Sequence, residues 1–311
     1  MDEIMVSAVI ITYQHRPYIA KALDSVLMQK TKYTYEILVA DDYSTDGTRD
    51  ILLDYKRKYG NRIRLILNSY NMGGTKNGYS VLKRAKGKYI ALLEGDDFWT
   101  DEYKLDKQVD YMEAHKDCSG VFHRCKFVDE NGVSLRINYR GWYSCKDGYT
   151  LKDFEKGKLP GQTGSFLYLN FYRESKGKYN FIYKIHNLVG DQTIYCILLT
   201  KGKFGYIDEE MSSYRLVRKK GAGNASSVCL EKNICLIMWR YYCQLEIIMK
   251  KRFNETVYLK VQRRGEVQSA KYKFMSNRNL QNLYIYLWVF IFNWLYETKL
   301  ILENHSKRRE E

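Results

Sequence analysis

Short apolar runs alternate with amphipathic stretches through the first hundred residues of the chain. Residues 6–11 form an almost continuous apolar run of strand length, and residues 35–40 form a second one. Such runs are typical of parallel strands that are buried on both faces. Residues 62–67 and 88–93 are predicted as two further strands. The pattern therefore predicts a sheet of several short, buried strands.

Helices are predicted between these strands, at residues 15–30, 46–60 and 79–85. Asp46 stands where an N-cap is expected and Gly60 where a C-cap is expected. The Gly- and Asn-rich residues 71–78 are predicted as a loop. Strands that alternate with helices form βαβ units with right-handed crossovers. We therefore expect an α/β fold with a mostly parallel central sheet flanked by helices.

The pattern changes twice farther along the chain. Beyond residue 100 it predicts a polar helix to about residue 115, strands at 119–129 and 163–170, a helix at 188–202, and two short strands with a basic loop at 203–223. From about residue 226, long helical periodicity with basic and aromatic side chains takes over. We expect two domains, 1–225 and 226–311, with the boundary near residues 224–228.

Composition narrows the classes of protein. Of the 311 residues, 45% are apolar and 28% charged, which is an ordinary globular balance. The net charge of +15 favours an anionic partner such as nucleic acid, a phosphorylated substrate or an anionic membrane. The basic residues are spread along the chain and no nucleic-acid-binding motif is present, so nucleic acid is not expected as a partner.

Cysteine usage and the first residues bear on location. The chain has seven cysteines and no CxxC pair, a pattern that favours reduced thiols. The stretch MDEIMVSAVIITY lacks a basic region before its apolar run, so no signal peptide is expected. We expect a cytoplasmic protein, with contact to the inner face of the cell membrane as a possible addition.

Polar clusters follow three of the predicted strands, at residues 12–16, 41–48 and 94–97. In parallel α/β sheets, ligands bind beyond the carboxyl ends of the strands. Since those ends share one edge of the sheet, the three clusters are expected to meet there. The sequence therefore predicts a binding site at this edge.

The third cluster lies in 93-LEGDDFWT-100. Asp96 and Asp97 are adjacent, so in an extended segment they point in different directions. All-oxygen ligation suits Mg²⁺ or Mn²⁺ bridging carboxylates to phosphates. A solvated acidic turn is the alternative. At the second cluster, the carboxylate of Asp42 can accept hydrogen bonds from a base N–H or a ribose hydroxyl.

Three stretches together resemble a known family. They are VSAVIITYQHRPYIAKALDSVLMQ at 6–29, EILVADDYSTDGT at 36–48 and LEGDDFW at 93–99. Their combination resembles a family 2 glycosyltransferase with the GT-A fold, of the kind that assembles bacterial surface polysaccharide. The resemblance covers about residues 5–220.

The resemblance implies an inverting, metal-dependent transfer of a sugar from a nucleotide-sugar donor, commonly UDP-linked, to a glycan or lipid-linked acceptor. The residues that would bind the nucleotide part are Thr12, Tyr13, Asp42, Lys76 and Asp96. Tyr13 would pack on the base, Asp42 would bind its edge, and Asp96 would contact the ribose.

Two further roles follow from the resemblance. Asp97 would ligate the divalent cation, Mn²⁺ or Mg²⁺, that bridges the diphosphate. Asp191 matches the position of the catalytic base, although spacing alone would equally make it a helix N-cap. A non-catalytic nucleotide or glycan binder on the same fold is the alternative function.

One departure concerns 214-YRLVRKKGAG-223. Many relatives carry Tyr-Arg-x-His here, and the histidine can help to hold the metal or diphosphate. Val217 stands in that place, so Arg218, Lys219 and Lys220 are left as point charges for the diphosphate. His15 is predicted as a helix-start residue near the nucleotide, and no histidine is assigned a role.

The C-terminal region contains 283-LYIYLWVFIFNWLYETKLIL-302. Its continuous apolar core, residues 283–295, would span roughly 20 Å as a helix, against about 30 Å for a hydrocarbon core. Aromatic residues with basic flanks suit a helix that lies on an anionic membrane surface. Packing against the catalytic domain or in a homo-oligomer is an equal alternative.

Overall fold

The structure is a computed structural model that describes residues 3–137, 148–174, 178–186, 189–217 and 234–307. It divides into two compact units. The N-terminal unit comprises residues 1–154 and 158–231, and the C-terminal unit comprises residues 155–157 and 232–311. The predicted domain boundary near 224–228 lies outside the described residues.

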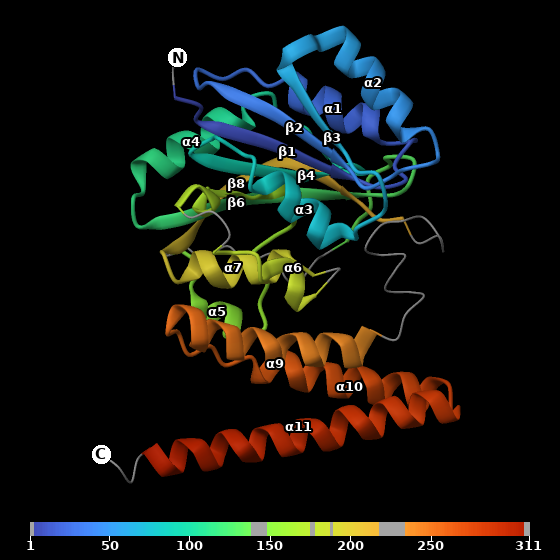
Figure 1. The fold of residues 1–311 in the computed structure, drawn as a ribbon, viewed down its shortest axis with the longest axis vertical. Helices are drawn as coiled ribbons and strands as arrows, with labels where there is room; N and C mark the ends of the chain where they lie inside the picture. Colours follow the sequence, from blue (N-terminus) through green and yellow to red (C-terminus); the bar gives the residue numbers. More distant parts are fainter. Residues whose placement is uncertain (1–2, 138–147, 175–177, 187–188, 218–233, 308–311) are drawn as a thin grey trace. The chain divides into compact units, whose positions relative to one another are not determined.

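The N-terminal unit is built on one eight-stranded sheet (Figure 1). Its strands are β1 Val6–Thr12, β2 Tyr35–Asp41, β3 Ile63–Leu67, β4 Tyr89–Glu94, β5 Phe98–Trp99, β6 Cys118–Val128, β7 Leu167–Leu169 and β8 Lys203–Arg215. The order across the sheet is β3-β2-β1-β4-β7-β6-β8-β5. The first four strands in this order are parallel, and β7 joins them to the parallel pair β6–β8 through antiparallel contacts. The predicted α/β fold with a mostly parallel sheet is confirmed.

Strand register brings the polar clusters to one edge. Ile11 of β1 is level with Ala40 of β2 and with Glu94 of β4. These three strands therefore end side by side, and the segments that follow them start from the same edge.

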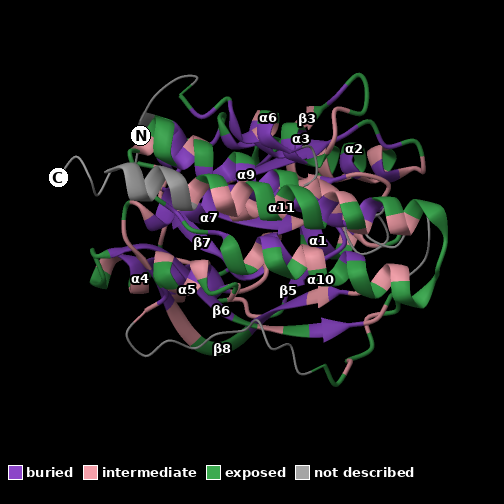
Figure 2. Ribbon diagram, turned by 90° about the horizontal axis from the view of Figure 1, so that it is seen from below, coloured by how far each residue is buried: buried purple, intermediate pink, exposed green. Residues whose placement is uncertain are grey.

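Helices cover both faces of the sheet. They are α1 Ile19–Leu27, α2 Thr48–Tyr59, α3 Gly74–Leu82, α4 Lys104–Ala114, α5 Leu151–Glu155, α6 Ile182–Ile185 and α7 Asp191–Leu199. Alternate residues of the central strands form one apolar core with α1, α2 and α4. In Figure 1, α3, α6 and α7 lie on the opposite side of the sheet from α1 and α2. The strands are buried on both faces, and this is why they are apolar almost without interruption (Figure 2).

Several predicted elements differ from the observed ones. The segment 203–215 is a single long strand, β8, because it pairs along its length with β6. Helix α3 begins at Gly74, so the second half of the predicted loop 71–78 is helical. The N-cap of α2 is Gly47, not Asp46, although the Asp46 carboxylate still accepts the Thr48 N–H. Gly60 is the C-cap, as predicted.

Two further segments are shorter than predicted. Helix α1 occupies only Ile19–Leu27 of the predicted 15–30, because residues 13–16 are held in a turn after β1. The predicted strand 163–170 is a 3₁₀ turn, Thr163–Ser165, followed by the short strand β7.

The C-terminal unit consists of three helices, α9 Ile234–Phe253, α10 Lys260–Ser276 and α11 Leu280–Lys307. Trp239 and Cys243 of α9 pack with Ala270 of α10 and with Ile285 and Val289 of α11. The middle helix, α10, is polar and shows little apolar periodicity in the sequence. No helix in the described part of the chain has both the length and the hydropathy of a membrane span.

Candidate active site

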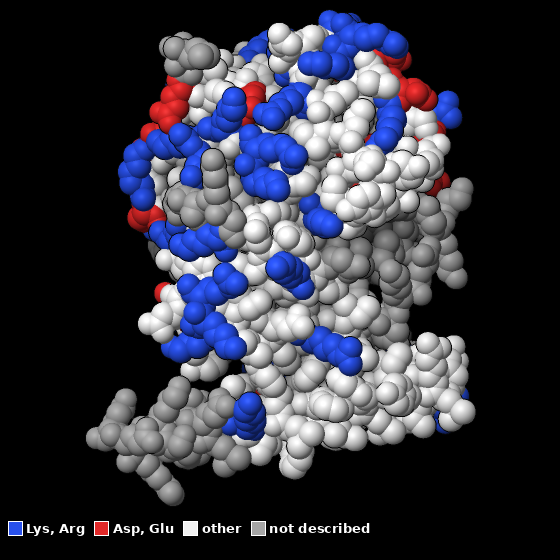
Figure 3. All heavy atoms as spheres, viewed as in Figure 1, with Lys and Arg blue, Asp and Glu red and all other residues white. Residues whose placement is uncertain are grey.

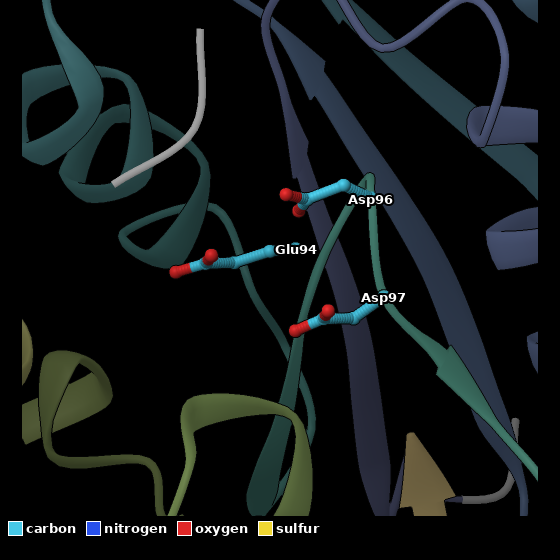
Figure 4. Close-up of side chains that lie close together, drawn as sticks. All are labelled: Glu94, Asp96 and Asp97. Carbon is cyan, nitrogen blue, oxygen red and sulfur yellow. The ribbon is translucent and has the colours of Figure 1, made fainter. Parts of the chain in front are cut away.

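Three carboxylates converge at the carboxyl end of β4. Glu94 is the last residue of the strand, and Asp96 and Asp97 follow in a turn in which the Asp97 N–H donates to the Glu94 carbonyl oxygen at 3.0 Å. One oxygen from each side chain lies within 4.8 Å of the others. Figure 4 shows the three side chains pointing to the same side of the turn. The sequence had left Glu94 without a role, and the geometry makes it a full member of the cluster.

Crowding of negative charge alters proton affinity in this cluster. Burial raises the pKa of Glu94 to about 8, and the charges of Asp96 and Asp191 contribute. Burial together with the charges of Asp96 and Glu94 raises the pKa of Asp97 well above its usual range, and Arg215 only partly opposes this. A divalent cation would relieve the repulsion, and oxygen ligands are those that Mg²⁺ and Mn²⁺ prefer. The donor set fits such a cation.

Arg215, at the end of β8, holds the acidic turn in place. Its backbone N–H donates to Asp97 Oδ1 at 2.7 Å, and its Nε donates to the Asp96 carbonyl oxygen at 2.8 Å. The guanidinium also lies 4.5 Å from the Tyr18 ring and donates to the carbonyl oxygens of Asp129 and Glu130. Sequence reasoning passed over Arg215, although it stands in the Tyr-Arg pair of the motif whose histidine is missing.

The aromatic pair after the cluster packs away from solvent. Phe98 and Trp99 are both buried, and Trp99 Nε1 donates to the Gly164 carbonyl oxygen at 3.0 Å. A Cβ at Gly164 would lie 3.9 Å from Asp97 Oδ2, so the segment around Thr163 approaches the acidic cluster. Both aromatic side chains therefore pack in the interior beside the acidic turn.

Asp191 is the first residue of α7, and the N-cap position belongs to Gly190. The N-cap alternative for Asp191 is therefore wrong. Burial raises the pKa of Asp191, although backbone N–H groups at the start of the helix partly oppose this. Its charge contributes to the raised pKa of Glu94, so the two carboxylates lie within electrostatic range. A carboxylate with raised pKa is a stronger base than a solvated one.

The Asp42 carboxylate accepts three hydrogen bonds from other residues of the chain. Oδ1 accepts hydrogen bonds from the Met72 N–H at 2.8 Å and from Asn68 Nδ2 at 3.1 Å, and Oδ2 accepts one from the Gly73 N–H at 2.8 Å. A carboxylate offers about four acceptor sites, so one remains for a ligand. Asp42 thus anchors the loop that leads into α3, a task that strand-end position alone does not indicate.

The turns after β1 and β2 are tied together by Gln14. Its Oε1 accepts the Thr45 and Asp46 N–H groups at 3.0 and 3.1 Å, and its own N–H donates to Ser44 Oγ at 2.9 Å. A left-handed backbone at Gln14, with φ of 57°, makes this arrangement possible.

The remaining predicted nucleotide-binding residues lie around this edge. Tyr13 follows β1 and is half-buried, whereas Lys76 is exposed in the first turn of α3, where its Nζ lies 5.8 Å from the Tyr70 ring centroid. Thr12 is buried at the end of β1, beside His15 and Asp96. Val217 is buried, and the basic residues 218–220 lie outside the described residues.

Comparison with known proteins fits this geometry. The family model described as glycosyl transferase family 2 matches residues 7–174. TuaG of Bacillus subtilis, named as a putative teichuronic acid biosynthesis glycosyltransferase, is 30% identical over 71% of this chain and 82% of its own length. Rv1520 of Mycobacterium tuberculosis is 42% identical over 127 residues, which is 41% of this chain and 37% of that protein.

Solved structures extend the similarity beyond the matched sequence. TarS of S. aureus, crystallised with UDP-GlcNAc, is 16% identical and superposes with a TM-score of 0.66 over 92% of this chain and 79% of that one. At this identity the likeness concerns the fold, which is of the GT-A type. The chain belongs to glycosyl transferase family 2.

Proposed function

We propose that this chain is an inverting, metal-dependent glycosyltransferase that moves a sugar from a UDP-linked donor to a hydroxyl of a glycan or lipid-linked acceptor in bacterial surface polysaccharide. The observation that carries the proposal is the convergence of Glu94, Asp96 and Asp97, with one oxygen of each within 4.8 Å of the others, and with the Asp191 carboxylate in electrostatic range. One end of the sheet thereby offers both a cation site and a base.

The relatives support the donor and the product class. TarS binds UDP-GlcNAc, and TuaG is named for teichuronic acid biosynthesis. A uridine diphosphate donor and a cell-surface polymer are therefore the first choices for this chain.

Asp97 would hold the cation, with Glu94 beside it in the carboxylate cluster, and Asp96 would contact the ribose. When bound, the cation supplies positive charge against the developing charge of the departing nucleoside diphosphate. Arg215 keeps the two aspartates in register through its contacts to the turn. Arg215 Nε contacts the backbone carbonyl oxygen of Asp96, so this contact leaves the carboxylate oxygens of Asp96 available for a ligand.

Asp191 would accept the proton of the acceptor hydroxyl. As the proton leaves, that oxygen forms a bond to the anomeric carbon of the sugar, and the bond from this carbon to the diphosphate breaks. The diphosphate departs with the bonding electron pair. One displacement inverts the anomeric centre, so an α-linked donor gives a β-linked product.

Release of UDP from a sugar donor, with Mn²⁺ or Mg²⁺ and candidate acceptors, tests the proposal. We expect Asp97→Ala to lower turnover by about 100-fold or more, by analogy with the loss of one charge-stabilising group. Asp191→Asn should abolish transfer while UDP affinity stays within about twofold of wild type. Asp54→Asn, on the exposed face of α2, is the matched control and should change neither quantity.

The alternative is a non-catalytic nucleotide or glycan binder, and the valine at position 217 motivates it. UDP binding by calorimetry without turnover across a panel of donors and acceptors would favour this alternative. Full activity of Asp191→Asn would instead remove Asp191 as the base.

We also propose that α11 contacts an anionic membrane surface. One face of this helix carries large apolar side chains that are exposed. They are Leu280, Tyr284, Leu287, Phe290, Ile291, Trp294 and Leu295. They stand opposite the positions that pack against α9 and α10. Residues 232–311 contain fifteen Lys and Arg against seven Asp and Glu. Like charge opposes pairing of two copies through this face and favours anionic lipid.

Co-sedimentation with vesicles tests the membrane contact. We expect the chain to bind phosphatidylglycerol-containing vesicles and to release them when Ile291 and Trp294 are both changed to serine. Leu53→Ser, at an exposed leucine of α2, is the control. A dimer that the double variant abolishes, without vesicle binding by wild type, would assign this face to a second copy.

A further inference from the structure

The surface formed by α3, by the residues after it and by the segment around α6 is strongly basic. Residues 76–86 and 178–186 contain six Lys and Arg and no Asp or Glu. All six are exposed, and none of them forms an ion pair with another described residue. We call them the basic face: Lys76, Lys83, Arg84, Lys86, Lys178 and Lys184. In Figure 3, Lys and Arg gather where α3 and α6 lie in front, and Asp and Glu lie mostly toward the edges of the N-terminal unit.

Tyr79 joins the two segments of the basic face. Its hydroxyl donates to Asn180 Oδ1 at 2.5 Å, and its ring centroid lies 5.2 Å from that of Tyr183 in α6. Lys83 Nζ lies 5.8 Å from the centroid of the same Tyr79 ring. Because Tyr79 is buried, this contact is part of the packed fold. It brings together positive charges that are about a hundred residues apart in the sequence, with no carboxylate of either segment between them.

One end of the basic face lies beside the proposed catalytic base. Gly190 lies against the first turn of α3, since a Cβ there would come within 3.1 Å of Thr75 Cγ2. Asp191 is the residue after this glycine, and Lys76 is the residue after this threonine. From Lys76 to Lys83, α3 advances by roughly 10 Å along its axis. A molecule whose hydroxyl group reaches Asp191 can therefore extend along a row of positive charges.

We propose that the acceptor is itself an anionic glycan chain, and that the basic face binds its phosphate or carboxylate groups while one of its hydroxyl groups meets Asp191. This inference rests on the proposed transferase function and names the chemical class of its acceptor. Exposed lysines and arginines attract such a chain over a distance and align it along the surface, so they act on association and on selection of the partner. A neutral glycan of the same length gains nothing from these charges.

Two other anionic partners fit the basic face less well. A protein surface that enters a membrane carries exposed apolar side chains, and residues 76–86 and 178–186, all of which the structure describes, present no large exposed one. Single-stranded nucleic acid stacks its bases on exposed aromatic rings. Tyr79 and Tyr179 are buried and Tyr183 is half-buried, so the two segments offer no such ring. A hydrophilic polyanion requires neither feature.

Binding of a fluorescently labelled dextran sulfate, measured by anisotropy, tests the inference, and uncharged dextran of the same length is the reference. We expect wild type to bind the sulfated chain and to release most of it when the salt concentration is raised from about 0.1 M to about 0.5 M. The triple variant Lys83→Gln, Arg84→Gln and Lys184→Gln should bind it at least about tenfold more weakly, since each exposed charge contributes about two- to fivefold. Saturating UDP and Mn²⁺ should leave the affinity within about twofold, because the chain binds outside the donor site.

The matched control is the triple variant Lys58→Gln, Arg62→Gln and Arg64→Gln. It removes the same charge from exposed positions around the C-terminal end of α2, a helix on the opposite side of the sheet from α3. Its affinity for the sulfated chain should stay within about twofold of wild type. Both triple variants should keep the wild-type affinity for UDP, because neither changes a residue assigned to the nucleotide. Thermal unfolding of both variants checks that they fold.

Equal losses of affinity in the two triple variants would overturn the inference, because net charge alone would then explain the binding. So would equal affinity of wild type for sulfated and uncharged dextran, or a loss of UDP affinity in the basic-face variant, which would make these residues donor contacts. Release of phosphatidylglycerol vesicles by that variant, with the sulfated chain still bound, would assign the face to a membrane instead. In all of these cases UDP release from a sugar donor still supports the transferase. Absence of that release from wild type, with the sulfated chain bound as expected, would count against the proposed function.

Discussion

Both units of the chain contain buried carboxylates that lie close together, but the negative charge is balanced in different ways. In the C-terminal unit, the buried guanidinium of Arg263 pairs with Glu246 of α9 and with Glu297 of α11, the latter at 2.6 Å. Lys260 adds a second cation at 3.3 Å from Glu297. In the N-terminal unit, the guanidinium of Arg215 is directed to backbone carbonyl oxygens, so the acidic side chains keep their repulsion.

The pKa values of Glu297 and Glu94 are shifted in opposite directions as a result. Burial raises the pKa of Glu297, but its contacts to Arg263 and Lys260 outweigh burial and lower it below the usual range. At Glu94, burial and neighbouring carboxylates act in the same direction and raise the pKa to about 8. In the first arrangement, cations of the chain itself balance the carboxylate charge. The second leaves negative charge unbalanced, and unrelieved charge of this kind is common at functional sites.

The largest effect is expected from Arg263→Met. It leaves Glu246 and Glu297 buried without their central cation, which costs on the order of 3–5 kcal/mol. Amide hydrogen exchange, read separately over the two units, should show the loss in α9, α10 and α11. Lys251→Met is the control, since it removes a charge at an exposed position of α9. Unchanged exchange in the three helices would contradict the central role of Arg263.

The pH dependences that Glu94 and Glu297 contribute to stability should have opposite signs. Between pH 4.5 and about 8, the folded chain keeps a proton on Glu94 that the unfolded chain has released. The N-terminal unit therefore loses stability as pH rises through this window, by on the order of 2 kcal/mol, when no divalent cation is present. Mn²⁺ should remove most of this dependence.

Glu297 provides the internal contrast, because its folded pKa is lowered. Its contribution to the C-terminal unit is present above pH 4.5 and is lost as pH falls below that value. Hydrogen exchange at about pH 3, pH 5 and pH 8, with and without Mn²⁺, measures both trends: the lower pair of pH values reports on Glu297 and the upper pair on Glu94. A flat response of the N-terminal unit without cation would contradict the crowding of charge at Glu94.

Asp97→Asn should stabilise the N-terminal unit in the absence of cation by about 1 kcal/mol, because it removes one of the repelling charges. The amide oxygen can still accept the Arg215 N–H, so the turn is preserved. The same change should abolish the stabilisation that Mn²⁺ gives to wild type. Thermal unfolding with and without the ion checks both, and a destabilised variant would show that the charge is already balanced.

The smallest effect is expected from Tyr296→Phe in the C-terminal unit. The tyrosine hydroxyl donates to Glu246 Oε2 at 3.0 Å, at the rim of the Arg263 network. Its loss should cost about 1 kcal/mol, since the guanidinium still pairs with the carboxylate. Chemical denaturation of Tyr296→Phe and of Arg263→Met measures the free energy of unfolding of each variant. The two values show how much the tyrosine hydroxyl and the guanidinium each contribute to stability.

The sequence pattern predicted the sheet edge and its acidic residues. Buried parallel strands have continuous apolar sequences, so the residues at which they end can be located in the sequence. The pattern placed Glu94 in the cluster without assigning it a role, and it did not foresee the contacts of Arg215 and His15. The position of Glu94 depends on the turn in which the Asp97 N–H donates to the Glu94 carbonyl oxygen. The contacts of Arg215 come from a strand that ends more than a hundred residues later, and the close approach of His15 depends on the glycine at position 95. Long-range pairings of this kind leave no local periodicity.

The same limit explains Asp42 and α3. Position after a strand marked Asp42 as a ligand-binding candidate, but its bonds to Met72 and Gly73 arise from a loop thirty residues away in sequence. Helix α3 begins at Gly74 despite two glycines and an asparagine, because tertiary packing of its apolar residues outweighs weak propensity.

The link made by Gln14 has a consequence for how a ligand meets this edge. Two loops that would otherwise move independently are joined by hydrogen bonds before anything binds. The loss of conformational freedom that usually accompanies binding at mobile loops has already occurred during folding. An incoming nucleotide therefore meets a rigid rim, so association should be limited by diffusion and orientation rather than by loop ordering.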